Sequence, residues 1–226
     1  MSDFISLEAM RHRMAKDAPL GSLGESAARR LWWGALETLQ SSILDPLKLS
    51  NGLWIAAPLP ALYEPKVLQK LQGCVWAPEE LKTLDKSLFG RLPPGSVDSL
   101  EPFNTSLSGQ YMRMPLKKED GVDPLLIVIT PELQVALALQ GKPGQRSLLM
   151  RSDQDTFSDL LKFIDIRLNY ESNSQALLLR QRLDELGELR SNKEVEKLFW
   201  PLLSERLATM SPSLKLQSIP DTKRTD

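Results

Sequence analysis

The stretch that decides the fold is LLIVITPELQVALAL, residues 125–139. Its first part, Leu125–Thr130, is almost wholly apolar, which is typical of a strand buried on both faces. Its second part, Leu133–Leu139, places leucine or valine at every second position, as a strand does. A third strand-like run, Gln145–Met150, follows a Gly- and Pro-containing turn of four residues. Such a turn between two strand-like runs indicates a hairpin, so we predict three antiparallel strands.

Two apolar runs farther upstream predict a parallel pair of strands. Leu53–Ala57 and Cys74–Ala77 are both continuous apolar runs that end at a proline. Pro65 opens a short helix between them at a favoured first-turn position, and Pro78–Phe89 predicts a second helix. Strand, helix, strand and helix in this order are typical of a parallel unit with a right-handed crossover. Gln110–Pro115 alternates in the manner of a half-buried edge strand.

Helices are predicted on both sides of these strands. A short helix is expected at Ser6–Lys16, and apolar residues recur every four positions from Ser22 toward Pro46, which predicts a long helix. Three more helices are expected: residues 152–170, capped by Ser152 or Asp153, then residues 174–188, and residues 191–210, capped by Ser191. The predicted fold class is therefore α/β (α+β), a mixed sheet with parallel N-terminal and antiparallel C-terminal strands, flanked by helices, plus a C-terminal helical pair.

These elements predict one α/β domain with additions at both ends. We assign residues 1–21 to an N-terminal extension with a short helix and residues 22–170 to the α/β domain. Residues 171–210 are expected to form a C-terminal helical pair packed on the domain or on a partner, and residues 211–226 a flexible tail. A chain of 226 residues can bury a core without a disulfide or a structural metal.

Charge and composition exclude several classes of function. The 28 basic and 29 acidic residues give a net charge of −1, without the basic surplus of a nucleic-acid-binding protein. The N-terminus lacks the pattern of a signal peptide, and no apolar run approaches the roughly 20 residues of a membrane helix. We expect a soluble, cytoplasmic protein with no nucleic-acid partner and no membrane insertion.

No motif in the sequence predicts an enzyme, and we expect no cofactor and no metal. The one histidine, His12, lies between two arginines and is expected on a helix surface. The one cysteine, Cys74, lies in an apolar run, where a buried, inert thiol is expected and a redox role is the alternative. No Walker A and no Gly-x-Gly-x-x-Gly sequence occurs. Carboxylates gather at helix starts, where caps and dipole partners are expected and catalysis is the alternative: Asp153, Asp155, Asp159, Glu79, Glu80 and Asp85.

Apolar residues on the last two predicted helices indicate a protein contact. Leu179, Leu183 and Leu186 follow 3–4 spacing among charged residues, a narrow stripe typical of a helix–helix contact. A hairpin with the following helix and a homodimer would both use this stripe. Phe199 and Trp200 form an aromatic cluster of the kind enriched at interfaces, with docking onto the chain's own sheet as the alternative. These five are the candidate interaction residues.

Residues 92–168 resemble the DICT sensory domain, a family associated with diguanylate cyclases and two-component signalling proteins. The resemblance is an order of features: Leu92-Pro93-Pro94-Gly95, Met114-Pro115-Leu116, Asp123-Pro124-Leu125, the strands at 127–131 and 134–139, and Ser152-Asp153 opening a helix. It implies a non-enzymatic sensory or regulatory module of bacterial signal transduction that works through protein–protein contacts. No kinase or cyclase domain follows in this sequence, so the signalling output is expected on a separate protein. The family transfers no ligand-binding residue.

Two other functions stay open on the residues alone. An assembly or accessory factor would bind a single protein client through the cluster at Trp200. An enzyme would use scattered carboxylates.

Overall fold

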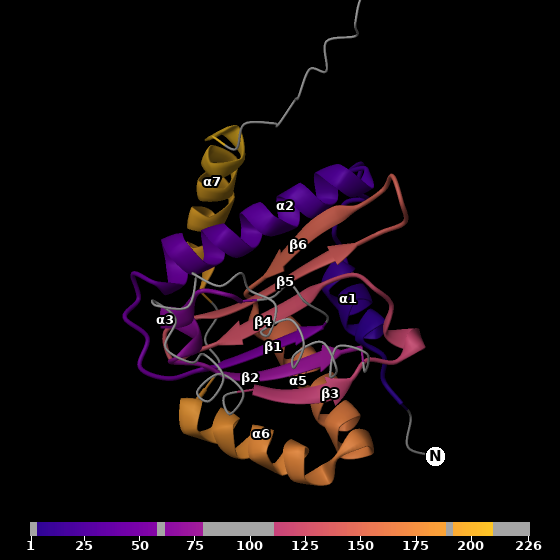
Figure 1. Ribbon diagram of the computed structural model, residues 1–226, viewed down its shortest axis with the longest axis vertical. Coiled ribbons are helices and arrows are strands. Elements are labelled where there is room, and N and C mark those ends of the chain that lie inside the picture. Colours follow the sequence, from indigo (N-terminus) through magenta and orange to yellow (C-terminus); the bar gives the residue numbers. More distant parts are fainter. Residues whose placement is uncertain (1–3, 58–61, 79–110, 189–191, 210–226) are drawn as a thin grey trace, which may run out of the picture.

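A six-stranded mixed sheet lies at the centre of the computed structural model, which describes residues 4–57, 62–78, 111–188 and 192–209 (Figure 1). The strand order is β3-β2-β1-β4-β5-β6. The bounds are β1 Leu53–Ala57, β2 Gln72–Ala77, β3 Tyr111–Pro115, β4 Leu125–Ile129, β5 Gln134–Gln140 and β6 Ser147–Arg151. β1, β2 and β3 are parallel to one another, whereas the β1–β4, β4–β5 and β5–β6 pairs are antiparallel. The predicted mixed sheet and the edge position of β3 are confirmed.

The central strands are buried on both faces, which explains their continuous apolar sequences. Every residue of β1 and β4 is buried, and successive side chains alternate between two separate hydrophobic clusters. We call the side of Trp54 and Leu137 the first face and the side of Ile55 the second face. The apolar side chains that β5 presents on the second face, Ala136 and Ala138, are small, so helices can pack closely there.

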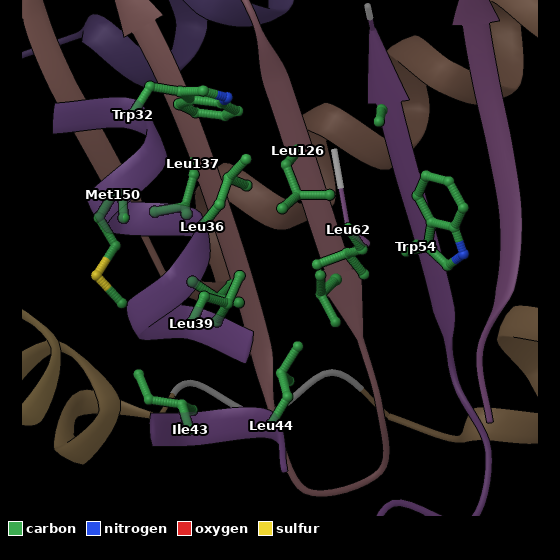
Figure 2. Packing of buried hydrophobic residues seen from close by; sticks show 14 of the residues in the cluster. Trp32, Leu36, Leu39, Ile43, Leu44, Trp54, Leu62, Leu126, Leu137 and Met150 are labelled. Atoms are coloured by element: carbon green, nitrogen blue, oxygen red, sulfur yellow. The ribbon is translucent and has the colours of Figure 1, made fainter. Parts of the chain in front are cut away.

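The first face is covered by α2 (Glu25–Glu37), the π-helix η1 (Thr38–Leu44) and α7 (Lys193–Thr209). Figure 2 shows side chains of α2 and η1, among them Leu36 and Leu39, packed toward Leu137 and Met150 of the sheet. The predicted long helix is confirmed, but its last part is π-helical. The buried Gln40 accounts for this, since its amide donates to the Leu36 carbonyl at 3.2 Å and accepts the N–H groups of residues 63 and 64.

The second face is covered by α1 (Leu7–Ala15), α5 (Gln154–Glu171) and α6 (Asn173–Leu186). Leu7, Met10 and Met14 are at most 1% exposed and belong to the same cluster as Phe157 and Ile164 of α5. Residues 7–15 are therefore part of the core, and the assignment of residues 1–21 to an extension is corrected. The sequence predicts this helix, but it does not predict that the helix packs on the second face of the sheet.

The two C-terminal helices pack on opposite faces of the sheet, so residues 171–210 do not form a helical pair. α6 contacts α5 on the second face, whereas α7 contacts η1 and α2 on the first. The chain changes face near Asn192, whose side chain donates to the Glu132 carbonyl at 3.3 Å and whose carbonyl accepts from Ser152 at 3.4 Å. The cap predicted at Ser191 lies outside the described residues, and the side chain of Asn192 accepts from the Val195 N–H instead.

Shorter elements complete the fold. The predicted helix between β1 and β2 is α3, Pro65–Leu68, and a 3-10 turn, η2, covers Lys118–Asp120. Asp153 caps α5 as predicted and accepts the Thr156 N–H at 2.8 Å. The helix predicted at residues 78–89 and the tail at 211–226 lie outside the described residues.

A buried ion pair joins α5 to the segment before β4. Arg167 donates through both terminal nitrogens to the two carboxylate oxygens of Asp120, each at 2.8 Å, and both side chains are fully buried. Asp120 also accepts the backbone N–H groups of Leu7 and Lys117, while Arg167 donates to the Ile5 carbonyl. One ion pair thus holds the start of α1, the end of η2 and the last turns of α5.

The network extends to the sheet through Glu171. Its carboxylate accepts from Arg167 Nε at 2.6 Å and from the Trp76 indole N–H at 2.8 Å. The buried Arg11 donates to the carbonyls of Asp120 and Asp123. Burial alone would raise the pKa of Asp120, but the hydrogen bonds from Arg167 and the two backbone N–H groups outweigh it and lower the pKa below its ordinary value.

Removing the carboxylate of Asp120 is expected to destabilise the chain strongly. Asp120→Ala leaves the Arg167 charge without its main partner and should lower the free energy of unfolding by about 3–5 kcal/mol, measured by urea denaturation at pH 7. The matched control is Asp165→Ala, which breaks the half-exposed pair with Arg180 and should cost much less. Equal losses in the two variants would contradict the structural role of the buried pair.

The lowered pKa of Asp120 also predicts how stability depends on pH. The charged carboxylate stabilises the fold fully above about pH 4, the ordinary aspartate value, and this contribution is lost as the pH falls through the lower folded pKa. Wild type and Asp120→Asn should therefore differ clearly at pH 7 and converge as the pH drops below about 4. Urea midpoints at several pH values measure this difference. A gap that stays constant down to pH 2 would show that Asp120 is not the titrating group.

Candidate functional site

The five candidate interaction residues lie in three different environments. Leu179 and Phe199 are 1% and 0% exposed and belong to the cores of the second and first faces. Leu183 and Leu186 are partly buried against the second-face core. Phe199 thus docks on the chain's own sheet, the alternative left open for it. The leucine stripe of α6 packs on the second-face core and not on the following helix, which lies on the other face. Trp200, by contrast, is 42% exposed.

The outward side of α7 exposes apolar residues beside this tryptophan. Val195, Phe199 and Leu203 form the buried stripe of the helix. Leu198 is 58% exposed, and Pro201, inside the helix, is exposed as well. Leu198 is a functional candidate that the sequence alone does not identify, because its spacing of three positions from the buried Val195 does not distinguish it from a core residue.

Close packing of α7 on α2 depends on a glycine. A Cβ atom at Gly34 would lie 3.0 Å from Leu207 and 3.2 Å from Leu203 of α7, so a larger residue would force the two helices apart. The neighbouring Trp33 is 45% exposed and contacts the ring of Tyr63. Large aromatic side chains therefore lie at the surface on the same face of the sheet as α7.

A hollow of about 510 Å³ lies at the amino ends of β1 and β2, beside α6. One part of its lining is apolar. It comes from the sheet, from α6 and from the segment that precedes β2: Leu53, Leu71, Met112, Leu178 and Leu179. The other part is polar: Ser50, Asn51, Gln69, Lys70, Gln72 and Arg182. A second hollow of about 360 Å³ shares Gln69 and Lys70 with the first and is also lined by Lys48 and Lys66.

The two hollows are lined by more cations than anions. Lys48, Lys66 and Lys70 form no ion pair with any described residue, and Asp45 is the one carboxylate in the described lining. Arg182 donates to Glu185 at 2.7 Å through one terminal nitrogen. Its Nε atom is buried and has no acceptor among the described residues. The sequence does not reveal this grouping, because Lys48, Lys66 and Lys70 lie in α3 and in the short segments around it, far from α6 along the chain.

The residues considered for catalysis do not come together in the described part of the chain. Asp153 caps α5, and Asp159 pairs with Arg13 at 2.7 Å. His12 is exposed, and within the described ranges no three of the metal-binding residue types are close enough to hold an ion. Glu79, Glu80 and Asp85 lie outside those ranges.

These features define a mixed α/β domain with helices on both faces, an exposed apolar surface on its last described helix and a cationic hollow beside α6. The chain belongs to the family described as a domain of unknown function, DUF8628, whose model matches residues 8–212. The match covers the described elements from α1, apart from its first residue, to α7. No curated protein and no solved structure matches the chain. Within the described residues, no helix has the length and apolarity that a membrane span requires.

The environment of Cys74 predicts its reactivity. The thiol lies in the second-face core, and burial, together with the charge of Glu171, raises its pKa to about 12. Because the thiolate is the reactive form, Cys74 should not react with a disulfide reagent such as dithionitrobenzoate in the native protein at pH 8. It should react fully in denaturant, with one thiol per chain. Rapid reaction of the native protein would instead support the redox role.

Proposed function

We propose that this chain is a non-catalytic sensory or regulatory module that acts through protein contacts, and that α7 carries the contact. The observation that carries the proposal is the exposed apolar surface of α7, formed by Leu198, Trp200 and Pro201. The resemblance to the DICT sensory domain supports the same role. The buried charged side chains Asp120, Arg167 and Glu171 support the non-catalytic part of the proposal. They form hydrogen bonds with one another and with the backbone, as structural groups do.

A second copy of the chain is the partner that fits this surface. Pro201 lies midway between Lys197 and Glu205, two exposed residues of opposite charge that are roughly two helical turns apart. Antiparallel pairing of two α7 helices about a two-fold axis at Pro201 places Lys197 of each copy beside Glu205 of the other. Such a contact is self-complementary, as a two-fold interface requires. The near-neutral net charge of −1 adds little repulsion between copies.

A charge exchange tests this pairing. Lys197→Glu places like charges together at both ends of the contact and should raise the dissociation constant of the dimer at least about fivefold. The double variant Lys197→Glu with Glu205→Lys restores opposite charges and should return the constant toward the wild-type value. Sedimentation equilibrium or light scattering over a range of concentrations measures both, and Lys142→Glu, on the remote β5–β6 turn, is the charge-matched control.

Two outcomes would contradict the proposed pairing of α7 helices. A wild-type chain that stays monomeric at every concentration contradicts self-association, and so does a double variant that associates as weakly as Lys197→Glu alone. Thermal unfolding should be similar in all four proteins, since these side chains are exposed.

A further inference from the structure

We propose that the two adjoining hollows form one binding site for an organic phosphate of about nucleotide size. The site lies at the amino ends of β1 and β2, between α3, the segment after η1 and α6. It uses none of the residues assigned to the α7 contact. The site rests on the proposed function in one respect: a ligand bound there would be the input of the proposed module. Ligand binding and association through α7 are measured by separate experiments.

The size and lining of the larger hollow fit a small organic molecule. A volume of about 510 Å³ falls within the range of roughly 300–1,000 Å³ in which proteins bind such ligands. Leu53, Met112 and Leu178 give it an apolar wall on which a planar or apolar group can lie. Asn51 and Gln72 can supply hydrogen bonds that orient that group.

The charges around the hollows select an anion. Lys70 lines both hollows, and Lys48 and Lys66 extend the positive charge along the smaller one. None of these lysines is neutralised by a described carboxylate, so each is available to a ligand. On the side of α6, Arg182 lines the larger hollow, and its side chain is 38% exposed. Phosphate oxygens are the acceptors that match such a group of lysine and arginine donors.

The backbone beside the site has two irregularities of the kind that proteins retain at functional sites. The π-helix η1 ends at Leu44, which lines the smaller hollow. Four residues later Lys48 has a positive φ of 50°, a conformation that is uncommon for a residue other than glycine. Lys48 thus lines the hollow in a backbone conformation that costs local energy.

The experiment is calorimetric titration of the wild-type chain with AMP, ATP and phenyl phosphate, with adenosine and inorganic phosphate as partial ligands. At least one organic phosphate should bind, and neither partial ligand should bind as tightly. Raising the salt concentration should weaken binding, because exposed lysines contribute much of the attraction. Vesicles containing phosphatidic acid form a separate arm that tests a lipid phosphate.

Two variants locate the site. Replacing Lys66 and Lys70 together by glutamine should raise the dissociation constant about tenfold or more, whereas Lys142→Gln, on the far end of the sheet, should leave it unchanged. Lys48→Gly removes a charge and also suits the positive φ, so affinity should fall while the unfolding temperature does not.

Three results would overturn the proposal. One is no binding of any organic phosphate at millimolar concentration. Another is binding that the double lysine variant leaves intact, and the third is binding only to vesicles. None of these depends on whether the chain associates through α7, which light scattering reports independently.

Discussion

The buried pair of Arg167 and Asp120 is the interaction on which the whole second layer of helices depends. A buried ion pair is favourable only when nearly every remaining donor and acceptor is satisfied, and here Leu7, Lys117 and Glu171 complete that set. These partners come from three separate parts of the chain. The pair therefore fixes where α1 and α5 meet the second face, which apolar contact alone would leave adjustable.

The same network determines where the candidate ligand site lies. Glu171, bonded to Arg167 and to Trp76, is the last residue of α5, and α6 begins after a single intervening residue, Ser172. From this fixed end α6 runs back along the sheet, so that Leu178 and Arg182 reach the amino ends of β1 and β2. The ion network thus lies just before the start of α6 and the hollow lies beside its middle, so the first sets the position of the second.

The sequence predicted the elements of this fold well and their arrangement less well. Continuous apolar runs identified the strands and their parallel or antiparallel order, because a strand buried on both faces leaves a clear pattern. That same property hides the face on which each helix packs, since both faces of the sheet are apolar. α6 and α7 were therefore expected to pair with each other, although they lie on opposite faces.

Side-chain roles were harder to predict than elements, for a related reason. Arg167 lies within an amphipathic helix and is charged, so the pattern places it at the surface, whereas Asp120, 47 positions away, draws it into the core. The π-helix depends on Gln40, whose side-chain oxygen accepts the N–H groups of residues 63 and 64, and no local pattern shows these contacts. The hollow is assembled from loops and a helix that meet only in the folded chain. Trp200 was identified because its residue type alone makes exposure noteworthy.

The unequal anchoring of α6 and α7 gives the proposed module a route from its hollow to its contact surface. In α6 only Ala176 and Leu179 are fully buried, whereas α7 buries Val195, Phe199 and Leu203. A ligand beside α6 therefore acts on the more weakly held helix, whose shifts cost less. Along the chain α6 precedes Asn192, the residue that caps α7. Because coupling between two binding events is reciprocal, a sensory module requires each event to change the affinity of the other. An assembly factor requires no such coupling, and this physical difference separates the two functions.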